Sequence, residues 1–205
     1  STDMQPTETE VSEATRMATF TPGSDAARKA ASKLEVPRIG VRFRLPAQMN
    51  NVQYFGRGPE ENYRDRRTSQ FIGEYTTPIK DLYEPYIRPQ ENEHRTDIYW
   101  CALTTKQKAG LLFIADRTFE LNASNYLLGS LDSGETIDNG APRTNETNHR
   151  HLTDPQPVKQ VDMFIDYRMM GVGGDNSWGA IAHEPYLIRP GVENAIEYGF
   201  SIVPF

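Results

Sequence analysis

Hydrophobic and polar residues alternate with a period of two in several parts of this chain. The alternation is clearest in three segments, whose apolar positions are Ile39, Val41, Phe43 and Leu45; Val161, Met163, Ile165 and Tyr167; and Ile196, Tyr198, Phe200 and Ile202. In an extended strand such residues share one face, and intervening polar residues such as Asp162 and Asp166 lie on the other. Each segment is therefore predicted to be a half-buried β-strand.

Two shorter runs, 98–103 and 110–115, are almost continuously apolar and are bounded by turn residues. Such runs are typical of strands that are covered on both faces. No segment after Val36 keeps a helical periodicity over three turns, and clusters of Pro, Gly and Asn separate the predicted strands. The pattern predicts an all-β fold, an antiparallel sandwich.

The first 34 residues have a different composition. Residues 1–15 are rich in Thr, Glu and Ser and carry almost no large apolar side chains. Such a segment cannot bury enough surface to order itself. The residue types favour a short strand over 15–21 and a short helix over 25–34. We therefore expect a partly disordered connecting segment over 1–34 and one β-sandwich domain over 35–205.

Composition and charge limit the classes of partner. The 205 residues suffice for one domain with a core, and the net charge is −6. No basic stripe is present, which argues against binding to nucleic acid. No apolar run approaches the roughly 20 residues that span a bilayer, which argues against a membrane protein. Cys101, the only cysteine, lies in a strand-like run and is predicted to be an inert buried thiol.

The octet at 171–178, Gly-Val-Gly-Gly-Asp-Asn-Ser-Trp, follows one of the predicted strands. Glycines let a backbone turn or approach a ligand closely, and an aromatic ring supplies stacking area at small entropic cost. The octet is therefore a candidate sugar platform, in which Trp178 stacks on a pyranose beside Asp175, Asn176 and Ser177. A Trp lid over the core of a β-sandwich would produce the same pattern, so the octet alone leaves both interpretations open.

Four residues form a candidate metal site. His149 and His151 share one face if the backbone between them is extended, and Asp154 and His183 would complete a cupin-like centre. The alternative is a structural pair of histidines that are hydrogen-bonded near a loop. The ordinary spacing of these residues favours the alternative.

The long polar stretch at 56–67 is expected to be either functional or mobile. Glycoside hydrolysis needs two carboxylates on opposite sides of the scissile bond, but the adjacent Glu60 and Glu61 face apart on an extended backbone. The dense polar groups from Glu60 to Arg66 predict a buried network of ion pairs and hydrogen bonds instead. Neither a nucleophilic triad nor a phosphate cradle is indicated, because the required Gly-x-Ser-x-Gly and helix-initiating patterns are missing.

Six motifs, in order along the chain, establish a resemblance to a known family. They are Val36–Gly40, Tyr54–Arg66, Asp81–Asn92, Arg95–Trp100, His149–Leu152 and Gly171–Trp178. With these motifs the chain resembles the C-terminal, small-chain domain of the β-galactosidases of glycoside hydrolase family 2.

The resemblance implies an antiparallel supersandwich of the galactose-mutarotase-like type. It also implies that the two catalytic glutamates and the magnesium ligands lie in a (β/α)8 barrel elsewhere in the same polypeptide. This chain would then hold no catalytic residue, metal or cofactor, and Trp178 would reach the rim of the barrel's galactoside pocket. The loop residues Asp175, Asn176 and Ser177 would shape that contact, and the intact enzyme would be a homo-oligomer.

Three departures from the family pattern qualify the resemblance. Asn176 stands where the family usually has Asp, which weakens a charge-based role for the loop. Glu93 stands where Gly commonly follows Glu-Asn, which suggests a locally altered turn. An upstream Trp-Arg-x-Pro-Thr-Asp-Asn-Asp segment of the same domain is missing from these 205 residues. The sequence therefore predicts a supersandwich that is truncated on its N-terminal side.

Three functional hypotheses follow, of which the first is favoured. The chain is part of a retaining β-galactosidase and is inactive alone. Alternatively, it is a free-standing carbohydrate-binding or aldose-mutarotase-like module. The third hypothesis, a cupin-like metalloenzyme, depends only on the four candidate metal ligands.

Overall fold

The computed structural model describes residues 35–87, 90–131, 155–176, 180–189 and 196–205. Within these ranges the chain forms seven strands, β1 (Arg38–Pro46), β2 (Asn51–Gly58), β3 (Phe71–Pro78), β4 (Arg95–Thr104), β5 (Gly110–Ser124), β6 (Gln160–Met169) and β7 (Phe200–Pro204). Three single-turn 3-10 helices are η2 (Ile79–Asp81), η3 (Leu128–Ser130) and η5 (Glu184–Tyr186). No α-helix occurs in this part of the chain, and none of its helices could cross a membrane.

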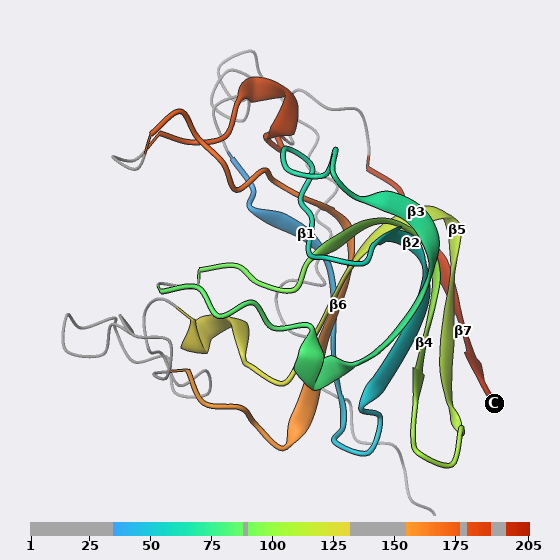
Figure 1. Cartoon of the computed structure of the whole chain (residues 1–205). Coiled ribbons are helices and arrows are strands. Elements are labelled where there is room, and N and C mark those ends of the chain that lie inside the picture. The colour runs from blue at the N-terminus through green and yellow to red at the C-terminus, as the bar shows by residue number, and fades with distance from the viewer. Residues whose placement is uncertain (1–34, 88–89, 132–154, 177–179, 190–195) are drawn as a thin grey trace, which may run out of the picture.

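All strand pairs are antiparallel and belong to one sheet with the order β1-β6-β5-β4-β2-β3. The 15-residue strand β5 has more than two partners along its length. Its first part pairs with β7 on one side and β4 on the other, and its last five residues pair with β6. Because β5 changes partners along its length, the sheet bends strongly, as Figure 1 shows. The predicted all-β, antiparallel fold is confirmed.

One face of the sheet carries the hydrophobic core. The register aligns Tyr54 with Cys101 and Phe113 on one side of the bend, and all three are buried. On the other side it aligns Phe43 with Met163 and Ala123. The rest of this cluster is Val52, Ile79, Leu82, Ile98, Leu103, Phe119, Leu121, Val161 and Ile165.

In β6 the predicted alternation of buried and exposed residues holds only for the apolar positions. Val161, Met163 and Ile165 are fully buried, but Asp162 and Asp166, which were predicted to lie on an open polar face, are also buried. Both aspartates face arginines of β1, and ion pairing makes this burial possible.

The predictions for three other segments need correction. The last strand begins at Phe200 and not at residue 196, and its Ile202 is 45% exposed. The runs 98–103 and 110–115 do form β4 and β5, but Tyr99 and Ile114 are more than 40% exposed. Within the described ranges these strands are therefore covered on one face only. The expected strand at 15–21, the expected helix at 25–34 and the connecting segment as a whole lie outside the described residues.

Two loops that are distant in sequence meet at one end of the sheet. The connection between β2 and β3 and the segment that follows β6 both lie at this end, and the β4–β5 turn lies at the opposite end (Figure 1). The candidate sugar platform therefore begins beside the polar stretch 56–67.

Candidate functional site

The polar stretch after β2 forms a buried hydrogen-bond network around Asn62. The side chain of Asn62 is fully buried. Its Nδ2 donates to the carbonyl oxygens of Arg57 and Glu60 at 3.1 and 3.0 Å. Its Oδ1 accepts from the backbone N–H and the hydroxyl of Thr96 at 3.0 and 2.7 Å. Asn62 thus fixes the loop after β2 to the start of β4.

Glu61 joins a second set of groups. One carboxylate oxygen accepts from Arg66 and from the hydroxyl of Tyr86. The other accepts from the Tyr63 hydroxyl at 3.2 Å and from the backbone N–H of Glu93 at 2.9 Å. Burial, and then the nearby Glu61 carboxylate, raise the pKa of the Tyr63 phenol well above its ordinary range. The structure therefore contains the predicted network, in which Glu61, Asn62 and Tyr63 are buried, whereas Glu60 and Arg66 at its ends are exposed.

The network continues beneath Tyr63 to His94. The His94 ring is buried and stacks on Tyr63, with 5.3 Å between ring centroids. Its Nδ1 lies 2.7 Å from Oδ1 of Asn122, and its Nε2 lies 3.0 Å from a carboxylate oxygen of Glu120. Burial lowers the pKa of His94, but the hydrogen bond to Glu120 and the charge of Glu120 outweigh burial, so the net pKa is raised. Both ring partners are acceptors, which suits a doubly protonated imidazolium.

Arg38 connects the His94 region to β6. Its Nε lies 3.1 Å from the buried carboxylate of Asp166, and its guanidinium lies 4.5 Å from the ring centroid of Phe164. Burial raises the pKa of Asp166 to about 7, although Arg38 and His94 oppose this rise. Arg38 belongs to one of the sequence motifs, but the motifs do not predict its contacts with Asp166 and Phe164.

Glu93 occupies an energetically unfavourable position in the network. Its backbone has a φ of 63°, in the left-handed region where glycine is favoured. Its Oε1 is buried without a hydrogen-bond partner among the described residues. Burial raises the pKa of this carboxyl to about 8, and Ser124 and Arg95 reduce the effect only partly. The backbone angle explains physically why a glycine suits this position.

The glycine-rich segment after β6 is fixed by Asp65. The two carboxylate oxygens of Asp65 accept the backbone N–H groups of Val172 and Gly173 at 3.2 and 2.7 Å. Gly171 donates its N–H to the carbonyl of Tyr186 at 2.8 Å. A Cβ on Gly171 would lie 2.5 Å from the Asp65 carboxylate, so this close approach requires glycine.

Beyond this base the two arms of the loop approach one another. A Cβ on Gly174 would lie 2.4 Å from the carbonyl oxygen of Ala180. Asp175 and Nε2 of His183 are 2.8 Å apart, and both side chains are largely exposed. Asn176 lies within the residues that the structure describes, and it interacts with a neighbouring group. Ser177 and Trp178 lie outside the described residues, so their proposed roles stay predictions.

The candidate metal ligands are only partly described. His149, His151 and Asp154 lie outside the described residues, whereas His183 contacts Asp175. Among the described residues, no group of three or more His, Cys, Asp or Glu side chains is placed to hold a metal ion. The predicted burial of Cys101 is confirmed, because its exposed fraction is 0%.

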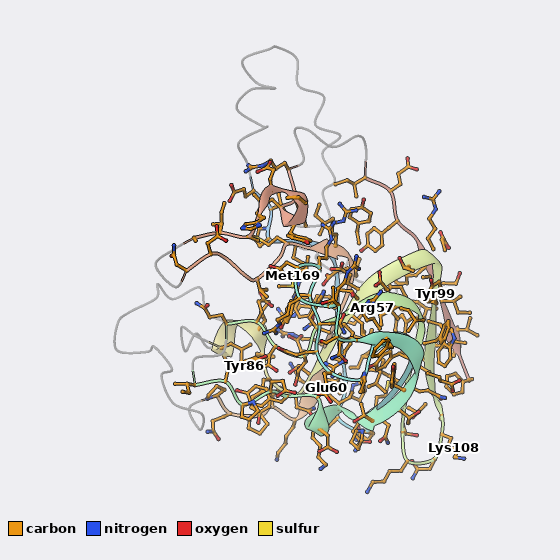
Figure 2. All side chains as sticks on the ribbon, turned by 45° about the horizontal axis from the view of Figure 1, so that its top comes forward. Arg57, Glu60, Tyr86, Tyr99, Lys108 and Met169 are labelled. Carbon is orange, nitrogen blue, oxygen red and sulfur yellow. The ribbon has the colours of Figure 1, made fainter. Side chains whose placement is uncertain are left out.

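A cavity of about 390 Å³ lies between the Glu61 network and the glycine-rich segment. Its walls include Tyr63, Arg66, Tyr86 and Glu91 on one side and 169–172 on the other. Figure 2 shows the crowded side chains between the labelled residues Glu60, Tyr86 and Met169. Burial raises the pKa of Glu91, with the charge of Arg38 acting in the opposite direction.

Comparison with known families identifies the chain. The model of the family described as "Beta galactosidase small chain" matches residues 5–202. The chain belongs to the β-galactosidase small-chain family. Similar proteins include the β-galactosidase of Priestia megaterium (strain DSM 319 / IMG 1521), with 33% identity over 75% of this chain and 13% of the relative. The β-galactosidase of Vibrio cholerae serotype O1 (strain ATCC 39541 / Classical Ogawa 395 / O395) also shows 33% identity, over 75% of this chain and 13% of the relative.

The β-galactosidase of Streptococcus thermophilus is 29% identical over 82% of the chain and 15% of its own length. The small-chain sequence therefore spans between 13% and 15% of the length of these relatives. Motif residues by which it resembled the family, such as Arg38, Asn62 and Thr96, contribute to the buried network. In this structure, these residues hold the loops at one end of the sheet.

Proposed function

We propose that this chain is part of a retaining β-galactosidase that hydrolyses terminal β-D-galactosides. Membership of the small-chain family and the names of the relatives support this proposal. The catalytic glutamates and a magnesium site belong, in this proposal, to a barrel domain elsewhere in the same polypeptide. The chain alone is inactive, and the intact enzyme is a homo-oligomer.

The segment 175–178 supplies the contact with substrate. The observation that carries this assignment is the fixed base of the loop, where two backbone N–H groups bind one carboxylate and Gly174 lies against Ala180. Only five residues, 175–179, connect these two close positions. Trp178 lies within this short connection and stacks on the galactoside, while Asp175, Asn176 and Ser177 shape the loop around it. Such a platform contributes binding and orientation.

The sheet face opposite the core forms contacts with the rest of the protein. The register brings Phe55, Trp100 and Ile114 side by side on this face. Tyr99 adds its ring 5.3 Å from that of Phe55. Exposed apolar groups that lie together mark interaction surfaces. Ile114→Lys should accordingly lower the thermal-inactivation temperature of the intact enzyme, whereas Lys106→Glu in the exposed β4–β5 turn should not.

Kinetics of the intact enzyme test the role of the loop. Trp178→Ala should lower kcat/KM for nitrophenyl β-D-galactoside by up to about tenfold, because an aromatic contact contributes roughly 0.5–1.5 kcal/mol. Phe205→Ala is the matched control, since it removes a ring that is 56% exposed beside Gly110, at the other end of the sheet, and it should leave kcat/KM within about twofold. Unchanged kinetics for the Trp178 variant would contradict the proposed substrate contact.

A second candidate function is carbohydrate binding by a free-standing, aldose-mutarotase-like module. The cavity lined by Tyr63, Arg66, Tyr86 and Glu91 favours it, because an aromatic wall with a few polar groups suits a sugar. A galactose titration followed by tryptophan fluorescence distinguishes the two functions. Saturation by millimolar galactose, reduced in a Tyr86→Ala variant, would support the second function, and a flat titration would remove it.

A further inference from the structure

A polar cleft of about 850 Å³ lies where β5 changes partners and the sheet bends (Figure 1). Its walls come from β5, the end of β6, the residues that lead into β7 and the connection between β2 and β3. The described residues that line it all differ from those that line the cavity beside Tyr86. Its volume lies within the roughly 300–1,000 Å³ that is usual for small-molecule sites. The cleft can therefore hold a ligand of that size.

An irregularity in β5 forms one wall of the cleft. Ile98 of β4 pairs with Phe119, but Trp100, two residues further along β4, pairs with Ile114. Residues 116–118 of β5 consequently have no partner in the pairings of the described strands. Such bulges redirect side chains and are frequent next to active sites. Here all three residues are exposed and line the cleft.

Another wall is held by an ion-pair cluster around Asp97. Its carboxylate accepts from Nε of Arg57 at 2.7 Å and from Nη1 of Arg67 at 3.0 Å. Its backbone φ of 56° lies in the left-handed region, which is costly for a residue with a Cβ. Residues in such conformations cluster at ligand sites. Asp97 and Arg67 both line the cleft, so this wall is rigidly positioned.

Two tyrosines give the cleft an aromatic surface. The rings of Tyr167 and Tyr198 both line it, and their centroids are 6.0 Å apart. The hydroxyl of Tyr198 donates to the carbonyl of Ile165 at 3.2 Å. The guanidinium of Arg168 lies 4.9 Å from the ring centroid of Tyr167. These contacts hold both rings in place, so little entropy is lost when a ligand packs against them.

The charges of the cleft indicate the class of ligand. Eight of the described residues that line it are charged, and they comprise four arginines and four acidic residues. Because these charges balance, the cleft has no excess charge that would select an anion or a cation. Most small-molecule sites are largely apolar, and this one is rich in hydrogen-bonding groups instead. A neutral ligand with many polar groups therefore suits it.

Hydroxyl groups match this wall chemically. Arginine offers only donors and a carboxylate offers only acceptors, whereas a hydroxyl is both donor and acceptor. Neighbouring hydroxyls of a sugar can therefore bind both kinds of side chain. The C–H faces of a pyranose suit the tyrosine rings. A neutral oligosaccharide combines all of these features.

We propose that this cleft is a binding site for a neutral oligosaccharide. Arg117 donates to sugar hydroxyls and Asp116 accepts from them, while Tyr167 and Tyr198 contact the rings. Hydrogen bonds in which one partner is charged are the stronger ones. The inference does not depend on the galactoside contact proposed above, because the residues that carry it all lie in the described part of the chain.

Calorimetric titration of the native protein that contains this sequence tests the ligand class. The neutral probes are maltotriose, cellotriose and raffinose, and the charged probes are trigalacturonate and the trimer of glucosamine. We expect a neutral trisaccharide to bind with a Kd of about 1 mM or below. Each charged probe should bind at least about tenfold more weakly, because its charge loses water without gaining an opposite charge. Flat titrations with all neutral probes up to about 10 mM would overturn the inference, as would tighter binding of a charged probe.

Arg117→Ala tests whether the sugar binds in the cleft. The variant removes donors from the bulge and should weaken binding about tenfold, because hydrogen bonds to charged groups contribute more than those between neutral groups. The matched control is Lys106→Ala, which removes an exposed cation from the β4–β5 turn at the other end of the sheet and should leave the affinity unchanged. Equal affinities of the parent and Arg117→Ala would show that the sugar binds elsewhere and would overturn the inference.

Asp116→Asn is an independent variant that keeps the size of the side chain and removes its charge. It should also weaken the binding of the trisaccharide, and an unchanged affinity would count against the cleft. Both positions are exposed, so the thermal midpoints should stay close to that of the parent. If Arg117→Ala lowers the midpoint, Arg117→Gln takes its place, and the same loss of affinity is expected. A lowered midpoint together with flat titrations of the parent would assign the cleft to contacts within the protein and overturn the inference.

Discussion

Glu93 should make the stability of this domain fall as the pH rises from about 5 to 8. The carboxyl is 1% exposed, and its pKa is raised by burial from 4.5 to about 8. Between these values the carboxyl is protonated in the folded state and ionised in the unfolded state. Unfolding then releases a proton, so the free energy of unfolding decreases with increasing pH.

The magnitude follows from the difference between the two pKa values. Each pKa unit corresponds to about 1.4 kcal/mol, so the free energy of unfolding falls by up to roughly 4 kcal/mol across this window. Glu93→Gln removes the ionisation and keeps the shape of the side chain. The variant should match the parent near pH 4.5 and exceed its stability by an amount that grows with every pH unit up to 8.

Glu93→Gly separates the charge from the backbone. At a φ of 63°, a residue with a Cβ carries a cost of about 1–2 kcal/mol, which glycine avoids. The greater entropy of glycine in the unfolded chain, however, lowers the free energy of unfolding by about 0.5–1 kcal/mol. The Gly variant should therefore lie within about 1 kcal/mol of the Gln variant and lack, as that variant does, the part of the pH dependence that comes from Glu93.

Urea unfolding at pH 5, 6, 7 and 8, followed by circular dichroism, measures these differences. Glu74→Gln is the control, because Glu74 is exposed on β3 and should leave the pH profile unchanged. Burial also raises the pKa of Asp166, to about 7. Its contribution to the pH dependence is the same in every variant and therefore largely cancels when their stabilities are compared. Parallel pH profiles for the parent and Glu93→Gln would refute the reasoning.

Two further predictions concern buried groups of the same region. Asn62→Ala should lower the free energy of unfolding by about 3 kcal/mol, because four hydrogen bonds are lost and the Thr96 donors are left buried. In urea unfolding the exposed Gln107→Ala should change it by less than about 0.5 kcal/mol, and equal losses for the two variants would contradict this role. The Cys101 thiol is fully buried, and burial raises its pKa. A thiol reagent should therefore modify the native chain at least about 100-fold more slowly than the urea-unfolded chain. Equal rates would show that the strand is open.

The all-β class could be predicted because apolar residues alternate along β1 and β6. Val161, Met163 and Ile165 reach the core as their spacing indicates. The same rule misplaced Asp162 and Asp166, because it treats every polar residue as solvent-facing. Their arginine partners lie on another strand, more than 100 residues away in sequence, and no local pattern shows that pairing.

The functional end of the sheet was predictable only in part. The density of polar groups indicated a network around Asn62, and the glycine-rich octet indicated a special loop. The contact between Asp65 and Gly173 was not foreseen, because it joins two loops that meet only when β2 and β6 occupy the same sheet. His94 was missed for a similar reason, since its ring partners come from β5.

The most direct measurement of the central proposal is galactoside hydrolysis by the native protein that contains this sequence. An antibody against residues 35–205 would isolate that protein from cell extract, and the isolate would be assayed with nitrophenyl β-D-galactoside. We expect hydrolysis to copurify with the antigen, on a polypeptide several times larger than 23.3 kDa. An antigen of about 23.3 kDa that is isolated without hydrolytic activity would contradict the proposal.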